Sequence, residues 1–361
     1  MKKHQTIFVL VLWGALALWA WVIPSRQISE AERRPLAQKP AFSVQTLLSG
    51  KFREDFESYS LDQFPLRQSF RSVKSLFHTG VLGQKDNNGI YLTNGTAVKQ
   101  EYPLNGDSVN HALGRFQRIY DQYLQENRCF YAIVPDKGYY LAEESGHLAM
   151  DYDALYARVA AGLPWAEEID LRPALTGQDY YRTDTHWRQE ALIPAATALC
   201  EGLGVTAPKT EDYRCTPVDR PFYGVYYGQA ALPMEPDTLY LMENDTLSQC
   251  TIFDYETGTT GSVYDMTKLD SRDLYDVYLS GAKALLTIEN PNAGTGRELV
   301  IFRDSFGSSI APLLLTDYAK VTLVDIRYVQ PELLEQYLDF HGQDVLFLYS
   351  TLVLNSSAAL K

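Results

Sequence analysis

Four nearly continuous apolar runs constrain the fold of this chain more than any other feature of its sequence. They cover residues 130–134, 299–302, 321–324 and 345–348. Stretches with helical spacing of apolar residues lie at 109–124, 308–315 and 331–340, so helices alternate with these runs. Strands that lack polar alternation are buried on both faces, which is typical of parallel sheets covered by helices. The sequence therefore predicts an α/β domain with a parallel sheet.

The first 24 residues differ from the rest of the chain. Basic residues Lys2 and Lys3 precede an uncharged, mostly apolar run over 6–23. A helix of about 18 residues spans about 27 Å, close to the hydrocarbon thickness of a bilayer. Basic residues before the run place the N-terminus in the cytoplasm and the body of the protein outside, in a single-pass protein of the cell membrane. We expect residues 1–24 to form an uncleaved signal anchor; a cleaved signal peptide is the alternative.

Composition limits the partners of the exported part. The net charge is −13 in 361 residues, which argues against a nucleic-acid partner or an anionic membrane surface, because both need clustered Lys and Arg. The four cysteines, Cys129, Cys200, Cys215 and Cys250, follow no zinc-binding spacing. An exported location permits disulfides in three pairings, and free buried thiols are equally compatible with the sequence. We predict no metal site and no cofactor.

The chain order suggests four regions. Residues 25–50 are polar and aperiodic and are expected to form a linker, and residues 51–350 an α/β domain. Within it, 52–77 has helical spacing that Pro65 divides, and Asn88-Gly89 is a hairpin-turn signal. Residues 206–268 are rich in Tyr, Gly, Thr and Asp and are expected to form a β-rich insertion. Residues 351–361 remain as a C-terminal tail.

Two short motifs carry the residue types of nucleophilic catalysis. Asp184 and His186 stand two positions apart, and Ser305 follows the apolar run that ends at 302. A serine becomes a useful nucleophile when a base removes its proton and a third group orients that base. We predict Asp184 as the orienting group, His186 as the base and Ser305 as the nucleophile. Taken locally, each motif also has a structural reading, as a chance Asp-x-His or as a helix cap.

Other residues near these motifs are candidates for binding substrate or an oxyanion. A helix predicted over 188–203 would place His186 at its N-terminus, capped by Thr183 or Thr185. Gly307 lies in a stretch of small residues suited to a sharp turn from strand to helix, where amide groups face a developing negative charge. The remaining candidates are Lys137, which follows the strand at 130–134, and the arginines that flank the two motifs, Arg182 and Arg303.

Asp184-Thr185-His186-Trp187, with the later Arg303-Asp304-Ser305-Phe306, resembles the DHHW family, which is related to the SGNH-like domains of bacterial alginate O-acetylation proteins. Similar stretches occur in the same order, and they cover about residues 50 to 350. They are Asp62-Gln63-Phe64-Pro65-Leu66-Arg67, Val134-Pro135-Asp136-Lys137, Phe222-Tyr223-Gly224 and the segment 315–328. Two positions depart from the family pattern: Thr185 replaces the first His of the signature, and Ser280-Gly281-Ala282 stands where a Gly-Asn pair is expected.

The resemblance implies an SGNH-hydrolase-like three-layer α/β/α domain with an Asp-His-Ser triad. It implies an acyl-serine intermediate on Ser305 that is passed to a hydroxyl of a cell-surface or secreted polysaccharide. It also implies a polytopic membrane-bound O-acyltransferase as the partner that supplies the acyl group. The leading hypothesis is therefore a membrane-anchored O-acetyltransferase. A carbohydrate acetylesterase with the same triad and a non-catalytic, glycan-binding subunit of an export complex are the alternatives.

Overall fold

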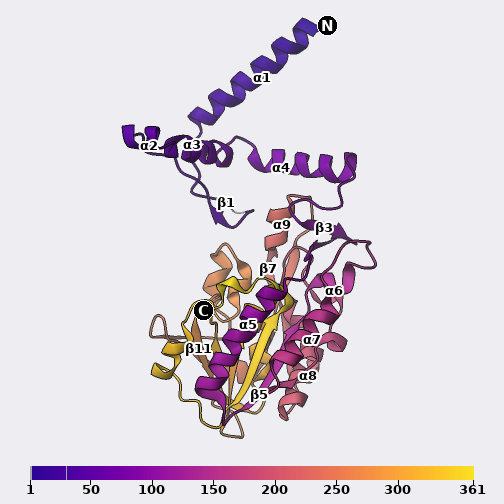
Figure 1. Cartoon of the computed structure of the whole chain (residues 1–361), viewed down its shortest axis with the longest axis vertical. Helices are drawn as coiled ribbons and strands as arrows, with labels where there is room; N and C mark the ends of the chain where they lie inside the picture. Colours follow the sequence, from indigo (N-terminus) through magenta and orange to yellow (C-terminus); the bar gives the residue numbers. More distant parts are fainter. Residues whose placement is uncertain (1, 30) are drawn as a thin grey trace. The chain divides into compact units, whose positions relative to one another are not determined.

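The computed structural model describes residues 2–29 and 31–361, and the chain divides into two compact units (Figure 1). The first unit comprises the residues up to Asn88 together with Tyr227–Met234. The second comprises Gly89–Tyr226 and Glu235–Lys361. Residues 51–88 thus group with the N-terminal part of the chain and not with the α/β domain in which the sequence placed them.

An eight-stranded mixed sheet forms the centre of the second unit, in the order β10-β9-β11-β13-β12-β14-β5-β6. The strands are β5 (Arg128–Val134), β6 (Glu167–Glu168), β9 (Thr251–Asp254), β10 (Thr259–Gly261), β11 (Leu285–Glu289), β12 (Arg297–Arg303), β13 (Tyr318–Val324) and β14 (Asp344–Ser350). The four apolar runs are β5, β12, β13 and β14, and each pairs in parallel with its neighbours among them. The predicted parallel sheet is confirmed for these four strands, but the sheet as a whole is mixed, because β11, β9 and β10 add antiparallel pairs.

The two outermost strands at the antiparallel end of this sheet, β9 and β10, come from the segment that the sequence assigned to a separate β-rich insertion. A tight turn after Asp254 joins β9 to β10, and a turn that short allows only antiparallel pairing. Of the segment 206–268, only the ribbon of β7 (Arg214–Phe222) and β8 (Asp237–Glu243) forms a sheet of its own.

Apolar side chains cover both faces of the main sheet. Along β5, Phe130, Ala132 and Val134 belong to one core cluster, and the alternating residues Cys129, Tyr131 and Ile133 belong to another. The first cluster includes apolar residues of α8 (Ile193–Leu203). The second includes those of α5 (Gly106–Ile119) and α7 (Tyr152–Gly162), and Figure 1 shows α5 lying along the sheet. The burial of β5 on both faces explains its unbroken apolar sequence.

The rest of the second unit consists of short elements. They are the hairpin β3 (Ile90–Thr93) and β4 (Thr96–Lys99), and the helices α6 (Lys137–Leu141), α10 (Asp245–Gln249), α11 (Gly307–Ile310) and α12 (Thr351–Asn355). The hairpin turns at Asn94-Gly95, both with positive φ, and not at Asn88-Gly89, because residues 77–81 before it are helical and offer no strand. The C-terminal residues are not a loose tail, since Leu354 and Leu360 are buried in the core.

Polar contacts organise the first unit, in which Leu36 and Pro65 are the only buried apolar residues among those described up to 88. Its elements are α1 (Lys2–Val22), the hairpin β1 (Ile28–Ser29) and β2 (Arg34–Pro35), α2 (Val44–Leu48), α3 (Lys51–Asp62), α4 (Arg67–Leu76) and a π-helical turn (Phe77–Val81). The break between α3 and α4 lies at Pro65, as predicted. Residues 25–50 are not an unstructured linker, because the hairpin and α2 occupy much of that stretch. Helix α9 (Val225–Ala230) contributes residues to both units.

One helix among the described residues is long and apolar enough to cross a membrane. The segment Lys3–Ala20 of α1 has a mean hydropathy of 1.3 and is not buried against the rest of the protein. A signal sequence has the same properties, so both readings of residues 1–24 remain open; Met1 lies outside the described residues.

We predict that Phe347→Ala lowers the free energy of unfolding by about 3–5 kcal/mol, because the ring sits at the centre of the second core cluster. Its centroid lies 4.8 Å from that of Phe302 and 5.1 Å from that of Phe116. The matched control is Phe253→Ala, at a partly exposed position of β9, which should cost about 1 kcal/mol or less. Urea unfolding of the detergent-solubilised protein measures both, and equal losses would contradict this account of the core.

Candidate active site

Three parallel strands end side by side and place Ser305 at the carboxyl edge of the sheet. Strand β12 pairs with β14, and β14 with β5, so all three run in the same direction. Ser305 follows β12 by two residues. Open α/β sheets hold their ligands at this edge.

Asp304 fixes the turn that carries Ser305. Its Oδ1 accepts the amide of Phe306 at 3.0 Å, and its Oδ2 accepts the amide and the hydroxyl of Ser350 at 2.8 and 2.6 Å. Because Ser350 ends β14, these bonds join the ends of two neighbouring strands. No side chain caps α11, so neither Asp304 nor Ser305 is the helix cap that the structural reading suggested.

The loop that carries Asp184 and His186 is closed by a bridge between Tyr180 and Trp187. The helix expected from 188 begins only at Ile193, because Pro194 is tolerated in the first turn of a helix and not in its interior. His186 therefore lies in the loop and not at a helix N-terminus. Neither threonine caps that helix: Thr183 Oγ1 donates to Asp237, and Thr185 Oγ1 accepts from Tyr226.

Asp184, His186 and Ser305 form one chain of hydrogen bonds. His186 Nδ1 lies 2.7 Å from Asp184 Oδ1, and its Nε2 lies 2.7 Å from Ser305 Oγ. A carboxylate only accepts, so Nδ1 carries the proton and Nε2 is left to accept from the serine hydroxyl. Asp184 and His186 are buried, whereas Ser305 is partly exposed. The arrangement can draw the proton from Ser305 and leave its oxygen nucleophilic.

Backbone amides complete the hydrogen bonding of the Asp184 carboxylate. Oδ1 also accepts the amide of His186 at 3.1 Å, and Oδ2 accepts the amide of Val225 at 2.7 Å. The residue before Val225 is Gly224, where a Cβ would lie 2.2 Å from the Cβ of Asp184. Glycine is therefore required for the close approach that brings this amide to the carboxylate.

Aromatic side chains hold the imidazole in place. The ring of Tyr275 stacks on His186 with centroids 3.8 Å apart and an interplanar angle of 7°. The Tyr275 hydroxyl lies 2.8 Å from Ser309 Oγ, and the indole Nε1 of Trp187 donates to the same oxygen at 2.9 Å. Ser309 thus connects the His186 loop to the segment that follows Ser305.

Asp237, at the start of β8, anchors the other side of the Asp184 loop. Its carboxylate accepts the amides of Arg182 and Thr183 at 2.9 and 2.8 Å, and the Thr183 hydroxyl at 2.6 Å. Sequence reasoning missed Asp237, Tyr275 and Ser309, since no local pattern marks them. Gly224 was visible only as part of the quoted Phe222-Tyr223-Gly224.

The buried residue Lys137 supports the peptide before the motif. Its Nζ donates to the carbonyl of Tyr181 at 3.0 Å and lies 4.9 Å from the ring centre of Tyr226. Burial lowers the pKa of Lys137 to about 7, and the nearby carboxylates, Asp184 first, oppose that shift. Its contacts are with the Asp184 loop and not with Ser305.

The two arginines and Gly307 also have structural partners. Arg182 is half exposed and pairs with Asp237 at 3.4 Å, not with Asp184. Arg303 is fully buried; its Nη1 donates to the carbonyl of Asp304 and lies 3.8 Å from Asp325. The amide of Gly307 donates to the carbonyl of Asp304 at 3.1 Å. Because this amide is already engaged, it is not available to bind an oxyanion. The structure thus brings Asp184, His186 and Ser305 together and engages the other candidates elsewhere.

Within the described part of the chain, no three His, Cys, Asp or Glu side chains gather as a metal site would require. The four cysteines are free thiols; Cys129, Cys200 and Cys250 are buried, and Cys215 is exposed.

Comparison with known proteins supports the expected resemblance. Residues 169–324 match the family model described as DHHW protein, and this range contains Asp184, His186 and Ser305. No curated protein matches the sequence significantly.

Solved structures share the fold. A DHHW family protein from Eubacterium siraeum is 23% identical with a TM-score of 0.63, over 76% of this chain and 94% of that one. PatB1 from Bacillus cereus is 17% identical with a TM-score of 0.60, over 73% and 96%. The O-acetyltransferase domain of AlgJ from Pseudomonas putida is 16% identical over 74% and 92%, with a TM-score of only 0.46. The first two similarities show that this chain shares its fold with the DHHW family protein and with PatB1.

We predict that Gly224→Ala lowers the thermal unfolding midpoint by several degrees, since the added Cβ would overlap the Asp184 backbone, 2.3 Å from its Cα. The matched control is Gly114→Ala in α5, where a Cβ meets nothing within 4 Å. That variant should leave the midpoint unchanged or raise it, because Ala favours helix over Gly. Scanning calorimetry of both variants decides, and an unperturbed Gly224→Ala protein would contradict the close approach.

A second prediction concerns Lys137. Its folded-state pKa of about 7 lies below the ordinary lysine pKa of 10.5, so between these values the unfolded chain binds a proton that the folded protein does not. Stability should therefore rise with pH from about 7 to 9.5, at up to about 1.4 kcal/mol per unit from this group. Lys137→Met should remove that slope, whereas below pH 7 both proteins should respond alike. Urea unfolding across this range measures the difference, and parallel curves would show that Lys137 keeps its ordinary pKa.

Proposed function

We propose that this protein is an exported, membrane-anchored O-acetyltransferase that modifies hydroxyl groups of a polysaccharide through an acyl-serine intermediate. The observation that carries the proposal is the hydrogen-bonded chain from Asp184 through His186 to Ser305, with 2.7 Å at each side-chain step. The match of residues 169–324 to the DHHW family supports it. So does a fold shared with PatB1 and the DHHW family protein.

In the first half-reaction, Ser305 Oγ attacks the carbonyl carbon of an acetyl donor. Its proton moves to His186 Nε2, and the imidazolium that forms is stabilised by the Asp184 carboxylate at Nδ1. The bond from the carbonyl carbon to the donor then breaks, and the donor leaves with the proton from Nε2. The amide of Ser305 has no partner among the described residues, and in this mechanism it would bind the oxyanion.

In the second half-reaction, a sugar hydroxyl gives its proton to His186 Nε2 and attacks the acetyl-serine. The bond between the acetyl carbon and Ser305 Oγ breaks, and Oγ recovers the proton. Water in place of the sugar hydroxyl would yield acetate, so an esterase and a transferase need the same three residues.

The carbohydrate acceptor follows from the resemblance, and one feature of the site supports it. Tyr223 is exposed and immediately precedes Gly224, which packs against Asp184. An exposed tyrosine offers a flat apolar face and a hydroxyl, a combination suited to sugar rings. Tyr226, in contrast, is buried, and its hydroxyl donates to Thr185, so it serves packing.

We further propose that α1 is retained as a single-pass anchor with its N-terminus in the cytoplasm. Lys2 and Lys3 precede the apolar segment, which fits this orientation. A polytopic membrane-bound O-acyltransferase would then deliver the acetyl group to Ser305 on the outer side.

An acetyl-ester reporter tests the triad. We expect turnover by the intact protein to fall about a thousandfold or more in Ser305→Ala and in His186→Ala. The chain offers a matched control in Asp339 and His341, a second Asp-x-His pair that is highly exposed. His341→Ala should leave turnover unchanged.

Adding an acetylated donor and an oligosaccharide acceptor separates the two enzyme classes. Acetylated sugar detected by mass spectrometry indicates transfer, whereas acetate alone indicates hydrolysis. Equal background in the intact protein and both triad variants would overturn both enzyme functions and favour a glycan-binding subunit.

A further inference from the structure

Helix α4 and the turn after it carry an apolar stripe that faces outward. Leu66, Phe70, Val73, Phe77 and Val81 are spaced by four, three, four and four residues, which places them on one side of a helix. Each exposes between 48% and 69% of its surface. Globular proteins normally turn such a stripe toward their core.

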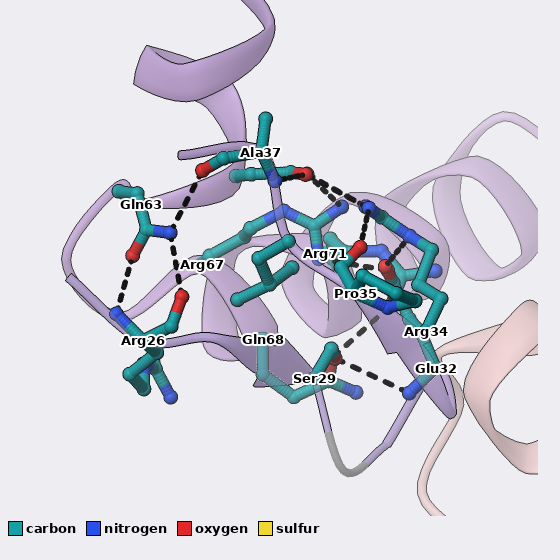
Figure 2. Close-up of polar contacts among 12 residues, drawn as sticks. Arg26, Ser29, Glu32, Arg34, Pro35, Ala37, Gln63, Arg67, Gln68 and Arg71 are labelled. Carbon is teal, nitrogen blue, oxygen red and sulfur yellow. Dashed lines mark hydrogen bonds and ion pairs between the residues drawn. The ribbon is translucent and has the colours of Figure 1, made fainter. Parts of the chain in front are cut away.

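Polar contacts hold another side of α4, about a third of a turn from the stripe, against other parts of the first unit. Arg67 and Arg71 both pair with Glu32, and Figure 2 shows this cluster of arginines around the hairpin. The buried hydroxyl of Ser75 donates to the carbonyl of Ala230 at 2.7 Å, and Arg71 Nη2 donates to the carbonyl of Gly228 at 2.9 Å. Because positions 67, 71 and 75 are spaced by four residues, these polar side chains also lie along one side of the helix. Rotating the helix to bury the stripe would break all of these bonds.

The charge of this segment differs from that of the rest of the chain. No Asp or Glu occurs from Gln63 to Lys85, although the whole protein carries a net charge of −13. The same stretch contains Arg67, Arg71, Lys74 and Lys85. The two arginines pair with Glu32 on the polar side, whereas Lys74 is exposed next to Val73 of the stripe. An outward apolar stripe with an exposed basic residue beside it is complementary to an anionic lipid surface, which offers acyl chains beneath negative headgroups.

Hydrogen bonds also hold the end of α3, four residues before α4, close to the end of α1. The side chain of Gln63 accepts the amide of Arg26 at 2.9 Å and donates to its carbonyl at 2.8 Å, as Figure 2 shows. Arg26 follows Val22, the last residue of α1, by four residues. Four residues span at most about 14 Å, and the headgroup layer on one side of a bilayer is about 5–8 Å deep, so Arg26 cannot lie far beyond the headgroups. A membrane that contains α1 would therefore have its surface at the level of α4.

We propose that the stripe of Leu66, Phe70, Val73, Phe77 and Val81 lies in the interfacial layer of an anionic bilayer, on the side where α1 leaves the membrane. The inference rests on the proposed retention of α1 as an anchor and is independent of the acetyltransfer reaction. The stripe thus contacts lipid in addition to α1, and the ion pairs of Arg67 and Arg71 with Glu32 hold the helix that presents it.

Fluorescent probes on single cysteines of the full chain test this. Cys215, the exposed thiol, is first replaced in Cys215→Ser, and an environment-sensitive dye is attached to Val73→Cys, Leu12→Cys or Glu57→Cys. The proteins are reconstituted in phosphatidylcholine vesicles with roughly a third phosphatidylglycerol, with and without bromine on the acyl chains. Val73 lies on the stripe, Leu12 lies within α1, and Glu57 is an exposed acidic position of α3 that serves as the control.

We expect brominated lipid to quench the probes at positions 73 and 12 at least about twofold more than the probe at position 57. Phe70→Ser with Phe77→Ser should remove the quenching at position 73 and retain it at position 12.

If brominated lipid quenches the probe at position 12 but quenches the probe at position 73 no more than the probe at position 57, the proposal is overturned while the anchor stands. Loss of quenching at both positions would overturn the anchor itself. A probe at position 73 that is shielded from aqueous iodide but not quenched by lipid would mean that a second copy covers the stripe, which also overturns the proposal.

Discussion

The burial of the Asp184 carboxylate is the constraint on which the candidate site depends. A buried charge is tolerated only when donors satisfy it, and here the donors come from the imidazole of His186 and from backbone amides on both sides of β7. Supplying the amide of Val225 requires a residue without a side chain beside Asp184, and holding the loop requires Asp237 on β8. The β7–β8 ribbon, an irregular addition in the sequence, is therefore part of the site's framework.

The sequence predicted the elements whose signal is local and strong. The buried strands β5, β12, β13 and β14 were recognisable because burial on both faces leaves an unbroken apolar run. The candidate triad was found from residue types, but local sequence could not distinguish its Asp-x-His pair from another pair with the same spacing. Asp339 and His341 have the same spacing as Asp184 and His186. They are highly exposed, however, and they take no part in the hydrogen bonds that the described residues of the candidate site make. Only the convergence of strand ends, a long-range property, separates the two pairs.

What the sequence did not predict depends on contacts between distant segments. Because Pro194 is accommodated in the first turn of α8, this helix begins at Ile193, seven residues after His186. The histidine therefore lies in a loop that the Tyr180–Trp187 bridge closes. Tyr275 and Ser309 act on the imidazole through stacking and a shared hydroxyl, for which no spacing rule exists. The division of the chain was also hidden, because the polar stretch after α1 is ordered by ion pairs around Glu32 and Asp62, not by an apolar core.

The two edge strands of the main sheet affect whether copies of this protein can pair through their sheets. One edge is β6, two glutamates long, and the other is β10, three exposed residues ending in glycine. Short or charged edge strands offer few unpaired amides to a neighbouring sheet, so they resist strand addition between molecules. Anchored as proposed above, the protein would meet its own copies at high local density, and edges of this kind allow such crowding without the growth of intermolecular sheets.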